Sequence, residues 1–102
     1  MSVDELFDGV AERMLAEDPS VELDRIFHST GLKTGGKFFA FVSKGDLVVK
    51  IPRERVTELV ASGDGRPLES GRRVMKEWVR LSPGDEATCA AYVAEAHRFA
   101  QP

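Results

Sequence analysis

Apolar residues recur at three- and four-residue steps near the start of the chain. They are Val3, Leu6, Phe7, Val10, Met14 and Leu15. This spacing places one apolar stripe along an amphipathic helix. Ser2 and Glu5 fit a capping box at its start. Pro19 ends it, because the residue before a proline is kept out of the helical region. We predict that the apolar stripe of this helix packs on a sheet.

Short β-type runs follow this helix. The first begins at Val21 and extends towards Phe27, without clear limits. The clearest strand covers residues 37–42, and its antiparallel partner covers residues 47–51. A Lys-Gly-Asp turn at residues 44–46 joins the two. The pattern therefore predicts a β-hairpin in the middle of the chain.

The next segment predicts a second helix and a loop. Pro52 suits the first turn of a helix. Gly63 is placed to end this helix in the left-handed conformation. Residues 63–71 (GDGRPLESG) are rich in glycine and polar groups, so we predict a mobile loop. A further strand is predicted over residues 74–81.

A last helix begins after this strand. Ser82 is placed to cap it, Pro83 suits its first position, and Asp85 complements its dipole. Its inner face is formed by small side chains. These are Cys89, Val93, Ala96 and Ala100.

The predicted order of elements is α-β-β-β-α-β(β)-α. Strands that follow one another through short turns pair in the antiparallel sense. We therefore predict an α+β fold with two layers, an antiparallel sheet of about four or five strands and three helices. The 102 residues are expected to form a single domain, residues 1–102.

Composition and charge narrow the function classes. The chain is 42% hydrophobic and 30% charged, as in ordinary globular proteins. Its net charge of -3 argues against a protein that coats nucleic acid. Residues 1–28 carry 8 acidic and 2 basic side chains, whereas residues 29–81 carry 6 acidic and 11 basic ones. The middle of the chain can thus present a basic surface; alternatively, acidic helices flank a Lys/Arg-rich sheet edge.

The sequence shows no constellation typical of an enzyme, a metal site or a cofactor site. Cys89 is the only cysteine, which excludes an internal disulfide. His28 and His97 belong to no motif with a nucleophile. There is no visible signal peptide and no apolar run of about 20 residues, so we expect a cytoplasmic protein without a membrane span.

The stretch GLKTGGKF at residues 31–38 fits the phosphate-binding pattern G-x-x-x-x-G-K. Phe38, however, occupies the position that needs Ser or Thr. The residues after Lys37 are strand-like, so no helix start faces the loop. We therefore predict that Gly35 and Gly36 form a hairpin turn, where positive φ is needed.

Trp78 is the most informative residue of the predicted last strand. Alternation places it with Lys76 and Arg80 on the face opposite the helices, while Val79 and Leu81 face the core. Either long cationic stems cover Trp78, or Trp78 is an aromatic anchor for an acidic or apolar partner. The candidate interaction surface contains Lys37, Lys50, Arg72, Arg73, Lys76, Trp78 and Arg80.

The phenylalanines of the central hairpin raise a related possibility. Only one alternation set can face the helices, so either Phe39 and Phe41 or Phe38 must lie on the outer face. Such an apolar outer face would suit a homodimer.

The order of these motifs resembles the N-terminal domain of the TfoX/Sxy family of bacterial competence regulators; the YjbR-like proteins are a near alternative. The resemblance covers roughly residues 21–100. The matching motifs are Gly36-Lys37-Phe38-Phe39-Ala40, Leu47-Val48-Val49-Lys50, Gly65-Arg66-Pro67 and Met75-Lys76-Glu77-Trp78. Residues 26–28 read Ile-Phe-His, where family members often carry Met-Phe-Gly.

The resemblance implies a small α+β domain with a non-enzymatic role in gene regulation, linked to transcription or competence. We accordingly expect a regulatory or protein-interaction module that binds a protein partner or itself. The alternatives are direct nucleic-acid binding through the basic central segment, and a small-molecule site or enzyme under the loop of residues 63–71.

Overall fold

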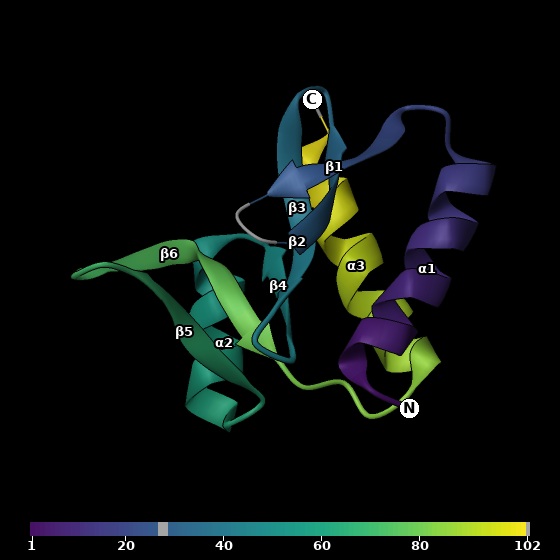
Figure 1. Cartoon of the computed structure of the whole chain (residues 1–102). Coiled ribbons are helices and arrows are strands. Elements are labelled where there is room, and N and C mark those ends of the chain that lie inside the picture. The colour runs from purple at the N-terminus through teal and green to yellow at the C-terminus, as the bar shows by residue number, and fades with distance from the viewer. Residues whose placement is uncertain (27–28, 102) are drawn as a thin grey trace.

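The computed structural model describes residues 1–26 and 29–101. These residues form three helices and one antiparallel sheet, shown in Figure 1. The elements are α1 (Val3–Glu17), β1 (Val21–Ile26), β2 (Ser29–Thr34), β3 (Lys37–Ser43), β4 (Asp46–Lys50), α2 (Arg53–Ser62), β5 (Gly65–Ser70), β6 (Arg73–Leu81) and α3 (Glu86–Ala100). The sheet has six strands in the order β1-β2-β3-β4-β6-β5. The predicted two-layer α+β fold is confirmed, with more strands than predicted.

Two strands were not predicted as such. β2 pairs with β1 from Thr34 opposite Val21 to Ser29 opposite Ile26. The predicted mobile loop at residues 63–71 is wrong, because most of it is β5, which pairs with β6. Pro67 is compatible with β5 because this strand lies at the sheet edge, where a missing N–H is tolerated. The predicted end of the first strand at Phe27 lies outside the described residues.

The helix ends follow local rules, with one correction. The capping box at Ser2 is present, and Gly63 ends α2 with a φ of 85°. The predicted start of the last helix, with Ser82 as its cap and Pro83 in its first position, is wrong, because α3 begins at Glu86. Asp85 caps α3, because its carboxylate accepts a hydrogen bond from the Thr88 amide at 2.8 Å. The hydroxyl of Ser82 instead donates to Asp46 Oδ1 at 3.3 Å.

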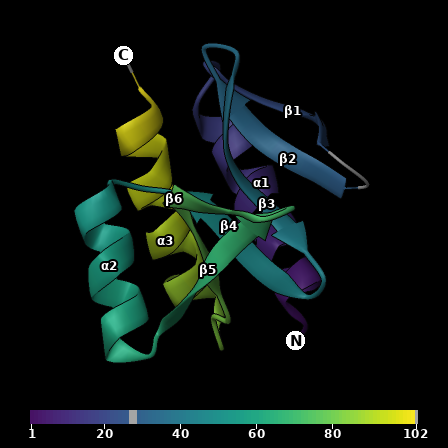
Figure 2. The ribbon, with the colours of Figure 1, turned by 90° about the vertical axis from the view of Figure 1, so that its left-hand side faces the viewer.

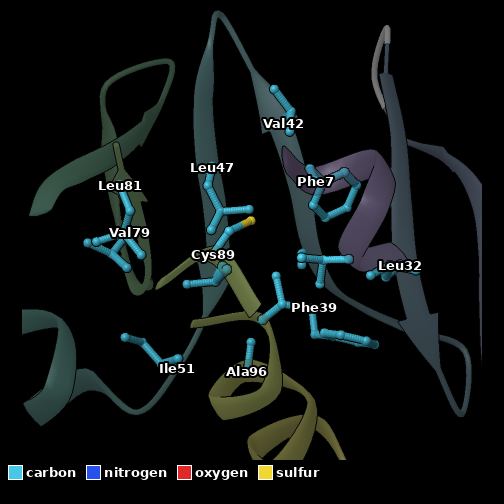
Figure 3. Close-up of a cluster of buried hydrophobic side chains, with 14 of the residues drawn as sticks. Phe7, Leu32, Phe39, Val42, Leu47, Ile51, Val79, Leu81, Cys89 and Ala96 are labelled. Carbon is cyan, nitrogen blue, oxygen red and sulfur yellow. The ribbon is translucent and has the colours of Figure 1, made fainter. Parts of the chain in front are cut away.

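The core lies between the sheet and the three helices, all of which contribute side chains to one buried cluster. Figure 3 shows part of this cluster. The predicted inner face of α3 is confirmed: Cys89, Val93 and Ala96 are fully buried. Burial raises the pKa of the Cys89 thiol to about 11. Cys89 therefore acts as a small apolar group and is protonated at neutral pH.

The predicted turn at Gly35 and Gly36 joins β2 to β3, with φ values of 57° and 78°. The GLKTGGKF stretch is thus a β-hairpin followed by a strand. A helix N-terminus that would face a phosphate is missing here.

β3 contains a bulge at Phe39 that changes the alternation of its side chains. Leu32 pairs with Ala40 and Lys33 pairs with Phe38, so Phe39 has no partner on β2. Phe39 and Ala40 consequently both join the core. Phe41 faces the other side of the sheet, where its ring centroid lies 5.5 Å from that of Trp78.

The outer-face residue Phe41 is only 3% exposed. The predicted apolar outer face therefore exists at Phe41, but this side chain is buried within the chain and offers no surface to a second copy.

α2 and the β5–β6 hairpin form one end of the molecule. In Figure 1 the tip of this hairpin projects away from α1 and α3, and Figure 2 shows α2 beside it. The two strands approach closely at Gly65, where an added Cβ would lie 2.7 Å from Val79 Cγ2 and 3.2 Å from Leu59 Cβ. None of the described helices is long and apolar enough to span a membrane.

Candidate functional site

Arg80 belongs to a polar cluster that ties β4, β5 and β6 together. Its Nε lies 3.0 Å from Asp46 Oδ2, and its terminal nitrogen donates to the Ser43 carbonyl at 2.7 Å. Arg66 lies 2.6 Å from Asp46 Oδ1. Burial alone would raise the pKa of Asp46, but hydrogen bonds from Arg80 and Arg66 outweigh it and lower this pKa. Of the seven predicted surface residues, Arg80 is thus bound within the fold.

Four other predicted residues line one open hollow of about 860 Å³. They are Lys50, Arg73, Lys76 and Trp78. The remaining lining residues are Pro52, Arg53, Glu54, Val74, Met75, Glu77 and Phe99. We call this the basic hollow, because four basic side chains face two acidic ones.

The register of β5 and β6 is interrupted at the residues of β6 that line the basic hollow. Pro67 pairs with Val79, whereas Leu68 pairs with Met75, so residues 76–78 have no partner on β5. On its other edge β6 remains held by β4, where the Glu77 carbonyl accepts a hydrogen bond from the Ile51 amide at 3.0 Å. The three extra residues therefore form a bulge on β6, and residues 76–78 line the basic hollow.

A second, apolar groove of about 490 Å³ continues from the basic hollow. It adds Pro67 from β5 and four residues of α2, namely Val56, Thr57, Val60 and Ala61. Five residues line both spaces: Arg53, Val74, Met75, Lys76 and Trp78. Because of these shared walls, we treat the basic hollow and the apolar groove as one continuous Trp78 surface.

The four cations of the Trp78 surface have no ion-pair partners among the described residues. Neither Lys50, Arg53, Arg73 nor Lys76 forms an ion pair with a carboxylate in residues 1–26 or 29–101. Five other cations are in ion pairs: Arg13, Lys33, Arg55, Arg66 and Arg80. The charges of the Trp78 surface are thus available to a ligand.

Two predicted residues lie beside this surface. Lys37 lines a smaller hollow of about 300 Å³, which shares Lys50, Glu77 and Phe99 with the basic hollow. Arg72 is exposed in the turn between β5 and β6 and lines neither part of the Trp78 surface.

Sequence reasoning missed Arg53 and Phe99. Arg53 begins α2 and Phe99 lies in the last turn of α3. Only the packing of these helices brings them to β6. The one available signal was Phe99 itself, a large apolar residue close to the end of an otherwise small-residue helix face.

Trp78 serves both the fold and the surface. It is half-buried, contacts Phe41, and lines the basic hollow and the apolar groove. Trp78 is thus partly covered within the fold, while its role as an anchor for a partner stays a prediction. Replacing Trp78 would disturb stability and binding together, so tests of binding need other residues.

His97 has a structural environment. Its Nε2 lies 3.5 Å from Asp18 Oδ2, and its ring centroid lies 5.2 Å from that of Phe39. His97 thereby connects α3 to the end of α1. His28 lies outside the described residues. The described residues contain no group of three or more His, Cys, Asp and Glu side chains that could hold a metal ion.

Comparison of the chain with protein-family models, curated proteins and solved structures finds no match.

Proposed function

We propose that the chain is a cytoplasmic, non-enzymatic regulatory module of the TfoX N-terminal type, which binds a protein partner through the Trp78 surface. One observation carries this proposal. Unpaired cations and exposed apolar side chains lie together in one continuous depression.

The distribution of exposed apolar side chains supports a protein partner. Six large hydrophobic residues of the described chain are notably exposed: Met1, Leu23, Val60, Val74, Met75 and Phe99. The last four line the Trp78 surface. Apolar side chains gathered around a half-buried tryptophan are typical of binding sites for proteins.

Direct nucleic-acid binding is the second candidate, favoured by the unpaired cations beside Trp78. Phosphates pair with such cations, and bases stack on aromatic rings. Glu54 and Glu77 in the same hollow oppose it, because they repel phosphate. The residues that line only the apolar groove are uncharged, so they offer no cation to a phosphate backbone.

Photo-crosslinking in the cells that express the protein distinguishes these candidates. We would place benzoylphenylalanine at Val74, which is 54% exposed on the Trp78 surface. The control places it at Leu23, which is 49% exposed on β1 at the opposite edge of the sheet. We expect a protease-sensitive adduct with a second protein from position 74 and none from position 23.

Other adducts would contradict the proposal. A nuclease-sensitive adduct from position 74 would assign the Trp78 surface to nucleic acid. Equal adducts from both positions would show that the contacts reflect exposure alone. An adduct of twice the chain mass that contains only this protein would identify the partner as a second copy.

A further inference from the structure

The charged and the uncharged side chains of the Trp78 surface lie in different parts of it, and this arrangement specifies the chemistry of its ligand. The residues that line only the apolar groove are uncharged: Val56, Thr57, Val60, Ala61 and Pro67. Those that line only the basic hollow include two cations and two carboxylates, which balance in charge. The excess positive charge therefore comes from Arg53 and Lys76, at the junction of the two spaces.

The junction also contains Trp78. A carboxylate placed there would lie near two cations without ion pairs, at the border of a groove whose other walls are uncharged. Charge-assisted hydrogen bonds at a partly enclosed site are stronger than those in open solvent. The junction thus selects an acidic group, and the groove selects an apolar one immediately beside it.

We propose that the Trp78 surface recognises a short linear segment of a protein partner in which one or two carboxylates directly adjoin large apolar side chains. This inference rests on the proposed function and assigns the ligand class of that site. The groove follows α2 from Arg53 to Ala61, a rise of about 12 Å. An extended segment of about four residues covers this length.

A nucleic acid fits the surface less well. Its phosphates would pair with Arg53 and Lys76, but the apolar groove would remain empty. Glu54 and Glu77 would face the continuing phosphate chain. A segment with few carboxylates and adjacent apolar side chains meets both constraints.

Selection from a random dodecapeptide library displayed on phage tests the assignment. We expect the selected peptides to share one or two Asp or Glu residues within about four positions of a large apolar residue. A labelled peptide with this consensus is then titrated against variants by fluorescence anisotropy. Lys76→Glu and Val60→Ser test the junction and the groove separately. Both positions are exposed, and Val and Ser have similar helix propensities.

Two matched controls lie on β1, at the opposite edge of the sheet. Arg25→Glu makes the same charge change as Lys76→Glu, and Leu23→Ser removes an apolar side chain of similar exposure to Val60. We expect Lys76→Glu and Val60→Ser each to weaken binding at least about tenfold. The controls should bind like the wild type. Thermal melting verifies that all four variants fold.

The outcomes separate this inference from the proposed function. Selected peptides that lack carboxylates, or equal losses in the controls, overturn the ligand class; a protein adduct from position 74 still supports the interaction function. No selected peptide, together with binding of single-stranded DNA that Lys76→Glu abolishes, overturns both.

Discussion

At the scale of single residues, Asp46 is a charged group bound within the fold by two ion pairs. It begins β4. One of its carboxylate oxygens forms an ion pair with Arg80 of β6, and the other forms one with Arg66 of β5. The side chain of Arg80 is only 17% exposed, whereas that of Arg66 is 59% exposed. The pair with Arg80 therefore contributes most, because exposed ion pairs contribute little.

Asp46→Asn removes the counter-charge of Arg80. We expect the free energy of unfolding to fall by about 2 kcal/mol at neutral pH, because a largely buried cation loses its partner. The folded-state pKa of Asp46 is lowered. Its stabilisation is thus fully present above the ordinary carboxyl pKa of about 4 and is lost as the pH falls through the lower folded value.

Urea unfolding of wild type and Asp46→Asn at several pH values measures this effect. The difference in unfolding free energy should be constant near neutrality and should shrink in acid. A difference that persists unchanged at the lowest pH at which both proteins fold would show that the ion pairs of Asp46 do not stabilise the fold.

At the scale of elements, β5 packs closely against α2 and β6. Gly65 allows this contact, because an added Cβ would lie 2.7 Å from the Val79 side chain. Val79 and Leu59 are both buried, so neither can move freely. The close packing of β5 on α2 and β6 thus depends on the absence of a side chain at Gly65.

Gly65→Ala should therefore be destabilising. We expect a loss of about 1–3 kcal/mol, as is usual for overpacking in a core. Gly84→Ala is the matched control, because nothing lies within 4 Å of its added Cβ. Urea denaturation compares the two. If both variants were equally stable, β5 would not pack on α2 as closely as the structure shows.

The bulge in β3 changes which side chains of this strand face the helices. By leaving Phe39 unpaired, it lets Phe39 and Ala40 face the helices while Phe41 faces Trp78. One strand therefore supplies aromatic side chains to both sides of the sheet. The contact between the rings of Phe41 and Trp78 depends on this change of alternation.

At the scale of the whole molecule, the fold places the acidic start of the chain and the basic Trp78 surface at different ends of the protein. The acidic first 28 residues contain α1 and β1, and β1 forms one edge of the sheet. The Trp78 surface lies near the other edge, between β6, β5 and α2. A ligand with carboxylates is therefore attracted to one end of the protein and repelled from the other.

One core cluster joins all three helices to the sheet. We therefore expect a single cooperative unfolding transition, as is usual for small single-core domains. Trp78 is the only tryptophan, so its fluorescence reports on β6, while circular dichroism at 222 nm reports mainly on the helices. The two urea transitions should coincide. An earlier fluorescence transition would show that the Trp78 surface unfolds separately from α1 and α3.

The sequence by itself determined the elements whose signals are local. The apolar stripe and capping box fixed α1, the positive-φ glycines fixed the hairpin turn at Gly35 and Gly36, and Gly63 fixed the end of α2. Such features depend on residues within a few positions of one another. They can be read without knowing what packs against them, and with the short turns they indicated an antiparallel α+β fold.

Only the tertiary structure decided the features that depend on distant partners. β5 has a loop-like composition and forms a strand because β6 supplies its hydrogen bonds. The bulge at Phe39 depends on pairing with β2. Of the predicted cations, Arg80 forms an ion pair with Asp46. Lys50, Arg73 and Lys76 line the basic hollow together with Arg53 and Trp78. Long-range packing decides which charges are paired and which stay free, and nothing in the local order of residues encodes that choice.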